Sequence, residues 1–171
     1  MTAACGNAAT SVLSTTVPET TQTVETQFTY APKTRPVVLG PVVRVGSLEF
    51  SVDVAADSEM RIKGLSGKGS LDGGTGMLFV FEKEERLRFW MRDMEIPLDM
   101  IWIDSNCRVV DVSENVPFPE PDTPLDDLPR YSPESPAKYV LEINGGESAD
   151  LGLGIGDQVE FVGPLAGKYG C

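Results

Sequence analysis

The sequence places several acidic side chains around one proline, beside an aromatic and a basic residue. Paired carboxylates next to an aromatic ring are how many sugar-binding and sugar-cleaving sites are built, with one carboxyl protonated and the other ionised. This segment therefore predicts a small pocket for a polar or carbohydrate ligand. Its candidate ligand-binding residues are Trp90, Arg92, Asp93, Glu95 and Asp99.

The same residues have a structural interpretation. Carboxylates in turns commonly accept hydrogen bonds from nearby backbone N–H groups. Asp99 would then cap the turn that leads into the next strand, and Arg92 would form an ion pair that holds the corner at Pro97. This second interpretation is the more common one for carboxylates in turns, and the sequence leaves both open.

The elements that must position this corner are short apolar runs between Gly76 and Asp104. Each run has the length and the β-branched or aromatic content of a strand and is too short for a helix. The expected elements are a strand over Met77–Phe81, a charged turn over Glu82–Arg86, a strand over Leu87–Met91 and a strand over Asp99–Asp104.

The flanking sequence continues the β pattern. Leu48, Phe50 and Val52 alternate with polar residues, which predicts a strand with one buried face. The further expected strands are Val42–Val45, Val109–Val116, Lys138–Ile143 and Gln158–Val162, and short helices are expected over 56–64 and 147–153. The stretch 117–136 is rich in proline, so it is expected to be a surface loop.

These elements predict one mostly β domain of the α+β class over residues 40–163. We expect an antiparallel, barrel-like sheet of seven or eight strands with one or two short helices, because closing the sheet protects the edges of many short strands. Residues 1–36 are rich in Thr, Ser and Ala and are expected to be a disordered tether. Residues 164–171 are expected to be a frayed tail.

Composition excludes several classes of function. The chain has 171 residues, no histidine and a net charge of −12. Without histidine, catalytic triads based on histidine and the HExxH zinc helix are excluded. The acidic balance repels phosphate backbones, so we expect no nucleic-acid partner. The cysteines have no CxxC spacing and the methionines have no soft co-ligand, so we expect no metal and no cofactor.

The cysteines give information on the cellular compartment of the protein. Thr2-Ala3-Ala4-Cys5-Gly6 resembles the end of a bacterial lipoprotein signal, and a long polar segment follows it. This pattern predicts lipid attachment at Cys5, which would be the protein's only connection to a membrane, and places it in the periplasm or on the cell surface. A plain disordered tail in a cytoplasmic protein is the alternative. Cys107 and Cys171 could form a disulfide, but the spacing does not determine the pairing.

Several blocks of the sequence resemble the domain-of-unknown-function 192 family over residues 48–161. The blocks are GLSG, GMLFVF, FWM, IPLDM, AKYVLEINGG and GIGDQV, in that order. The resemblance implies a compact, mostly β domain, found in small and often exported prokaryotic proteins without an established activity. The family commonly has Arg where this chain has Lys68, and Asn-Thr near Met94-Glu95. Lys68 is therefore added to the candidate ligand-binding residues.

Two functions from different classes follow. The first is an exported or surface-tethered domain without enzymatic activity, which binds a small polar ligand or a protein of the cell envelope. The second is a hydrolase that acts on a glycan or cell-wall substrate, with Asp99 and either Asp93 or Glu95 as its pair of carboxylates.

Overall fold

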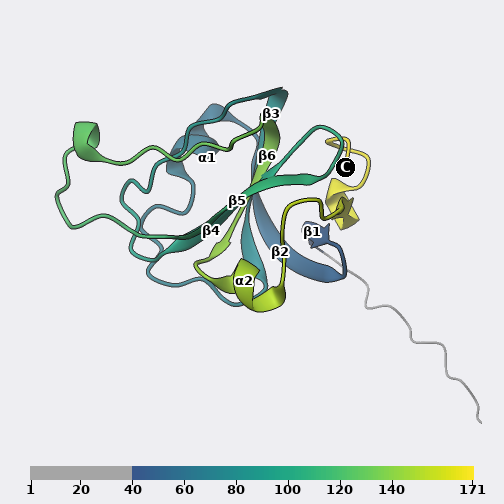
Figure 1. The fold of residues 1–171 in the computed structure, drawn as a ribbon, viewed down its shortest axis with the longest axis horizontal. Helices are drawn as coiled ribbons and strands as arrows, with labels where there is room; N and C mark the ends of the chain where they lie inside the picture. The colour runs from purple at the N-terminus through teal and green to yellow at the C-terminus, as the bar shows by residue number, and fades with distance from the viewer. Residues whose placement is uncertain (1–39) are drawn as a thin grey trace, which may run out of the picture. The chain divides into compact units, whose positions relative to one another are not determined.

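The computed structural model describes residues 40–171, and Figure 1 shows how their strands and helices are arranged. The predicted tether over residues 1–36 and the predicted lipid attachment at Cys5 lie outside the described residues. Within the described part, no helix combines the length and the apolar character that crossing a membrane requires.

The domain is mostly β, as the sequence predicts. Seven strands form one sheet in the order β5-β4-β6-β3-β2-β1-β7. The strands are β1 (Val42–Val45), β2 (Leu48–Ala55), β3 (Thr75–Glu85), β4 (Leu98–Ile103), β5 (Val109–Val116), β6 (Ala137–Asn144) and β7 (Val159–Val162). The helices are α1 (Ser58–Lys63) and α2 (Glu147–Leu151), with 3-10 turns η1 (Leu125–Asp127) and η2 (Gly163–Leu165).

The sheet is mixed, which corrects the prediction of a purely antiparallel sheet. β2 and β3 run parallel, whereas every other neighbouring pair is antiparallel. The cause is the connection between them. α1 and the glycine-rich loop over 64–74 carry the chain back to the starting end of β2, so β3 must run in the same direction.

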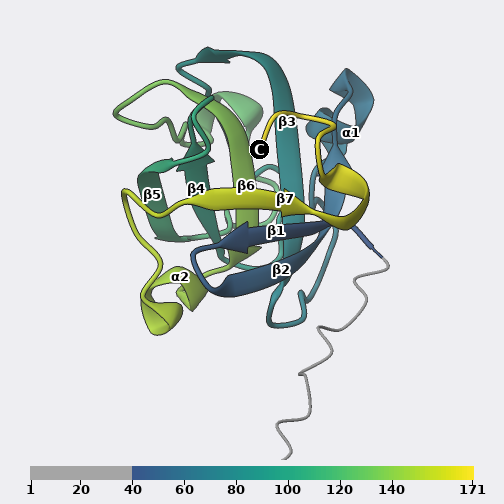
Figure 2. The ribbon, with the colours of Figure 1, turned by 90° about the vertical axis from the view of Figure 1, so that its right-hand side faces the viewer.

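The sheet is also open, which corrects the prediction of a closed barrel. β5 and β7 are its two edges, and an isolated bridge between Arg108 and Gln158 joins the starts of these strands. Strong curvature brings β1, β2 and β7 across the front of β4 and β6, so that the strands form a half-barrel (Figure 2). Backbone hydrogen bonds from the N–H of Val109 to the carbonyl of Asp157 and from the N–H of Val159 to the carbonyl of Cys107 join the two edges at this end.

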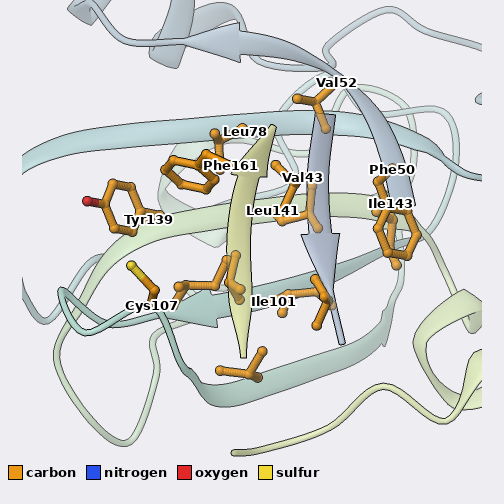
Figure 3. Close-up of a cluster of buried hydrophobic side chains, with 14 of the residues drawn as sticks. Val43, Phe50, Val52, Leu78, Ile101, Cys107, Tyr139, Leu141, Ile143 and Phe161 are labelled. Atoms are coloured by element: carbon orange, nitrogen blue, oxygen red, sulfur yellow. The ribbon is translucent and has the colours of Figure 1, made fainter. Parts of the chain in front are cut away.

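The concave face of the sheet holds the larger apolar core. Side chains from all seven strands contribute to it, and Figure 3 shows a close-up of this cluster. The predicted alternation of β2 is confirmed, since Phe50 and Val52 are buried and Glu49, Ser51 and Asp53 are exposed. The labelled members of this core are Val43, Phe50, Val52, Leu78, Ile101, Cys107, Tyr139, Leu141, Ile143 and Phe161.

A second apolar cluster covers the convex face of the central strands. It is built on Phe79 of β3, Met100 and Trp102 of β4 and Val140 of β6. The chain segments that cover it come from the loop after α1 and from residues 86–97. Both faces of β4 and β6 are therefore buried, and a polar side chain on either face needs an explanation.

Residues 82–91 differ from the prediction. β3 continues to Glu85, so the charged residues expected to form a turn lie in the exposed end of a strand. The expected strand over Leu87–Met91 is replaced by a single bridge, in which Phe89 and Tyr131 exchange two backbone hydrogen bonds of 2.9 Å. The partner of this segment is thus the proline-rich loop, where proline spacing prevents a longer ladder.

The C-terminal segment differs from the frayed tail that the sequence predicts. Leu165 is buried in the concave core, and Cys171 forms a disulfide with Cys107, 64 residues earlier. The Tyr139 hydroxyl also donates a hydrogen bond to the Tyr169 carbonyl. These contacts attach the end of the chain to the turn between β4 and β5 and to β6.

Candidate functional site

Asp99, the central residue of the predicted site, is fully buried and hydrogen-bonded inside the protein. Its Oδ1 accepts from the N–H groups of Asn115 and Gly146 at 2.6 and 2.8 Å. Its Oδ2 accepts from the N–H and the hydroxyl of Ser148 at 2.8 and 2.5 Å. This carboxylate connects the start of β4 to β5 and to the first turn of α2. Asp99 therefore holds parts of the fold together, as in the structural interpretation of the sequence.

The register of the sheet also separates Asp99 from the other candidates. In the ladder between β4 and β6, Asp99 lies opposite Ile143 and Met100 lies opposite Glu142. Ile143 belongs to the concave core and Met100 to the convex cluster. Because successive strand residues point to opposite faces, Asp99 points away from the face on which Trp90 and Arg92 lie.

The remaining candidates fall into separate groups. Lys68 forms an exposed ion pair with Asp53, at 3.4 Å between Nζ and Oδ2. Arg92 Nε donates to the neighbouring Asp93 Oδ2 at 3.2 Å. Arg92, Asp93 and Glu95 border a depression of about 550 Å³ against the proline-rich loop. Of the predicted residues, Trp90 and Arg92 border a second pocket, on the convex face.

This second pocket, of about 370 Å³, is the candidate site. Its volume lies in the range of small-molecule sites. Three segments build its walls: α1 with the turn that follows it, the central part of β3, and residues 88–94. Its lining residues are Ser58, Arg61, Ile62, Lys63, Gly64, Leu65, Ser66, Phe79, Phe81, Arg88, Phe89, Trp90, Arg92, Met94 and Glu142.

Glu142 of β6 lies at the floor of this pocket and is 5% exposed. Its neighbours across the two ladders are Met77 of β3 and Met100 of β4. Within residues 40–171, its side chain has no hydrogen bond and no ion pair. Burial among apolar groups disfavours the charged form and raises the pKa of Glu142 to about 8.

Cationic side chains surround the mouth of the pocket. Lys63, Arg88 and Arg92 are exposed there. Neither Lys63 nor Arg88 has a hydrogen bond or ion pair from its side chain within the described part of the chain. Arg61 is fixed, because it donates to the carbonyl of Val80 at 2.8 Å and its guanidinium lies 4.9 Å from the centre of the Phe81 ring.

Aromatic rings form the walls between mouth and floor. Phe89 makes edge-on contacts with Phe79 and Trp102, at centroid distances of 5.0 and 5.3 Å. Trp90 is half-buried, and the guanidinium of Arg130 lies 4.4 Å from the centre of its ring. These contacts fix the rings, so the pocket is already formed without a ligand.

Sequence reasoning missed Glu142. The signal was present in the strand KYVLEI, where Glu142 alternates with Tyr139, Leu141 and Ile143 and shares a face with Val140. An acidic residue on that face is ordinary when the face is exposed. It becomes informative only when both faces are known to be buried, and the sequence alone does not establish that for β6.

The arrangement does not match the pair of carboxylates expected for a hydrolase. Glu142 is the one acidic side chain among the residues that line the candidate pocket. Asp99 is buried on the other face, and Asp93 and Glu95 border the separate depression. In the described residues, no group of three or more His, Cys, Asp or Glu side chains is placed to hold a metal ion.

Solved structures share this fold. A protein from Sinorhizobium meliloti, whose description proposes a transcription regulator, is 27% identical, with a TM-score of 0.64 over 72% of this chain and 95% of that chain. A protein of unknown function from Novosphingobium aromaticivorans is 32% identical, with a TM-score of 0.63 over 77% of this chain and 94% of that chain.

Family comparison agrees with the resemblance found in the sequence motifs. No curated protein matches the chain. The model of the DUF192 family, described as "Uncharacterized ACR", matches residues 42–161. The matched range runs from the first residue of β1 to the penultimate residue of β7, so it includes every strand of the half-barrel and the floor and walls of the candidate pocket. The chain therefore belongs to the DUF192 family.

Proposed function

We propose that this protein is a binding domain, without enzymatic activity, for a small organic anion that has an apolar body. The observation that carries the proposal is the pocket on the convex face, in which cationic groups surround an apolar interior. Of the charged residues that line it, Arg61, Lys63, Arg88 and Arg92 are cationic and Glu142 alone is acidic.

The charge at the mouth supports an anionic ligand. The chain as a whole carries a net charge of −12, so a local group of four cationic side chains stands out against it. Lys63 and Arg88 have no side-chain partner within residues 40–171, and both can turn toward a carboxylate or phosphate. Arginine in particular can donate two parallel hydrogen bonds to such a group.

The interior supports an apolar or aromatic body. Phe79, Phe89 and Trp90 present ring surfaces, and Leu65 and Met94 complete the walls. Removing about 100 Å² of apolar ligand surface from water contributes about 2.5 kcal/mol. A neutral sugar would use neither the cationic mouth nor the aliphatic wall, so a carbohydrate is the less suitable ligand here.

A direct binding measurement tests this proposal, with 4-methylbenzoate as the probe. Calorimetric titration of the full chain is expected to give one site with a dissociation constant of about 0.1–1 mM, as for a ligand of this size. Arg88→Gln is expected to weaken binding about two- to fivefold. The matched control Lys83→Gln, which removes an exposed charge outside the pocket, leaves it unchanged. Absence of saturable binding to the wild-type chain overturns the proposal.

We further propose that the protein works outside the cytoplasm. The Cys107–Cys171 disulfide supports this, because such bonds form and persist in oxidising compartments. Fractionation of cells that make the protein from its native gene, with thiol alkylation before lysis, tests the location. We expect an extracytoplasmic protein with this disulfide formed. A reduced protein in the cytoplasmic fraction would contradict the proposal.

A further inference from the structure

Glu142 is the most deeply placed charged residue of the candidate pocket. It is 5% exposed, whereas Lys63, Arg88 and Arg92 at the mouth are exposed. A buried carboxyl group without a hydrogen-bond partner costs free energy relative to an apolar side chain of the same size. The described part of the chain supplies no such partner. Water in the pocket, or a ligand that displaces this water, is the remaining source of one.

We propose that the ligand of this pocket carries a protonated amine that pairs with Glu142, at the opposite end from the anionic group held at the mouth. The inference rests on the proposed function, since it adds a second charged group to the same organic anion. The ligand class is then a zwitterion whose charges are separated by an apolar or aromatic body.

The groups that face Glu142 from each neighbouring element favour an amine. Beside Glu142, β3 presents Met77 and Phe79, and β4 presents Met100, so its ladder neighbours carry no charge. The charged residues of β3 lie at the exposed far end of that strand, over 82–85. The charged lining residues of the pocket are otherwise all cationic, from α1 and from residues 88–92. A cationic ligand group can therefore pair with Glu142 alone.

The aromatic walls add to this preference. An ammonium group is attracted to the face of an aromatic ring, and the attraction is stronger where water is excluded. Phe79 and Phe89 both line the pocket in which Glu142 forms the floor. A carboxylate together with aromatic faces is a common way to bind an ammonium group. A ligand oxygen would find a single donor at the floor, the O–H of the protonated Glu142 carboxyl.

Binding of the amine has a consequence for protons. Burial raises the pKa of Glu142 to about 8, so the carboxyl of the unliganded protein is mostly protonated at neutral pH. An ammonium group brings its own protons and pairs with the carboxylate. The carboxyl proton therefore leaves to solvent, one proton for each ligand bound, and affinity rises with pH up to about 8.

Two matched probes test the inference on the wild-type full chain. 4-Methylbenzoate and 4-(aminomethyl)benzoate have the same ring and carboxylate, and the second adds an ammonium group at the far end. Calorimetry at about pH 6 and about pH 7, in two buffers that differ in ionisation enthalpy, measures affinity and proton release together. We expect the affinity for the amine to rise nearly tenfold over that interval, with release of about one proton.

The comparison separates the two proposals. Equal affinities for the two probes, or tighter binding of the amine without proton release, would overturn the inference while leaving anion binding in place. If neither probe binds, the proposed function fails with it. Glu142→Gln is expected to abolish both the preference for the amine and its pH dependence, and the exposed Glu114→Gln to retain them. Because the two probes are compared on the wild-type chain, the test does not depend on how well the variant folds.

Discussion

Glu142 lies directly opposite Met77 in one ladder and directly opposite Met100 in the other, so its carboxyl is placed between two thioether side chains. Neither neighbour can donate a hydrogen bond to it. This relationship accounts for the raised pKa of Glu142, and it makes the charge of this residue depend on what occupies the pocket.

The first prediction concerns stability and pH. In the unfolded chain the pKa of Glu142 has its ordinary value of 4.5, and in the folded chain it is raised to about 8. Between these values the folded state binds more protons than the unfolded state, so this residue's contribution to stability is present at low pH and is lost as the pH rises. The slope is at most about 1.4 kcal/mol per pH unit.

Glu142→Gln is therefore expected to be more stable than the wild type at about pH 8, by about 1–4 kcal/mol, and closer to it at about pH 5. Urea denaturation at both values measures the difference. Glu114→Gln, at an exposed position on β5, controls for the loss of one surface charge. If the free energies of unfolding of Glu142→Gln and the wild type differ by the same amount at both pH values, the raised pKa of Glu142 is contradicted.

The second prediction concerns the close approach of β3 and β6 beside the pocket floor. A Cβ atom at Gly76 would lie 2.3 Å from the carbonyl oxygen of Glu142, which is shorter than any normal contact. Gly76→Ala must push the two strands apart, and it is expected to cost about 1–3 kcal/mol of unfolding free energy.

Gly154→Ala provides the control, because a Cβ there meets no atom within 4 Å. Thermal or chemical denaturation of the two variants tests the contrast. A Gly76→Ala protein as stable as the control would show that β6 can move away from β3 without cost. The position of Glu142 would then be less fixed than the structure indicates.

The third prediction separates Asp99 from ligand binding. Its two oxygens accept four hydrogen bonds inside the protein, and an asparagine cannot accept all of them because one oxygen becomes an NH₂ donor. Asp99→Asn is expected to lose about 2–4 kcal/mol of stability. Ser148→Ala, which removes one of these bonds, is expected to lose about 1 kcal/mol.

Both variants are expected to bind 4-methylbenzoate with the wild-type dissociation constant, as long as they are assayed where they are folded. On the same samples, denaturation measures the stability of each variant and calorimetry measures its dissociation constant for 4-methylbenzoate. An Asp99→Asn protein that is as stable as the wild type but has lost binding would return Asp99 to the candidate site.

The fourth prediction concerns the C-terminal attachment. The Cys107–Cys171 bond closes a loop with a sequence separation of 64 residues. Its removal therefore raises the conformational entropy of the unfolded chain. Cys171→Ser is expected to cost about 2–4 kcal/mol, and reduction of the wild-type protein is expected to cost the same. Cys5→Ser serves as the control. A Cys171→Ser protein with unchanged stability would show that the disulfide adds nothing to the stability of the fold.

The sequence predicted the elements well where hydrophobic alternation is regular. Phe50 and Val52 identified the buried face of β2. The helix expected over 56–64 is present as α1, and its N-cap residue Asp57 accepts at Oδ1 from the N–H of Met60 at 2.8 Å. These signals are local, so they do not depend on how distant strands pair.

What depends on distant pairing could not be predicted. The parallel pairing of β2 with β3 follows from the path of the 58–74 connection, and the open edge follows from the curvature of the whole sheet. The bridge between Phe89 and Tyr131 replaced an expected strand, because its partner lies in a loop whose position no local pattern specifies.

The candidate site shows the same division. Of the predicted ligand-binding residues, Trp90 and Arg92 line the pocket, whereas Asp99 and Lys68 have partners elsewhere in the fold. The concentration of acidic residues near Pro97 suggested one site, but strand alternation and the path of the chain distribute them over different surfaces. Glu142, 43 positions after Asp99, joins the pocket only through the pairing of β6 with its two neighbours.

The most direct test of ligand binding uses the two tryptophans of the chain. Trp90 lines the pocket, whereas Trp102 is fully buried and its indole N–H donates to the hydroxyl of Ser113 at 3.0 Å. In an NMR titration with 4-methylbenzoate, the indole N–H signal of Trp90 is expected to move and saturate, while that of Trp102 moves far less. If neither signal moves, or if both drift together without saturation, the pocket is not a binding site for organic anions.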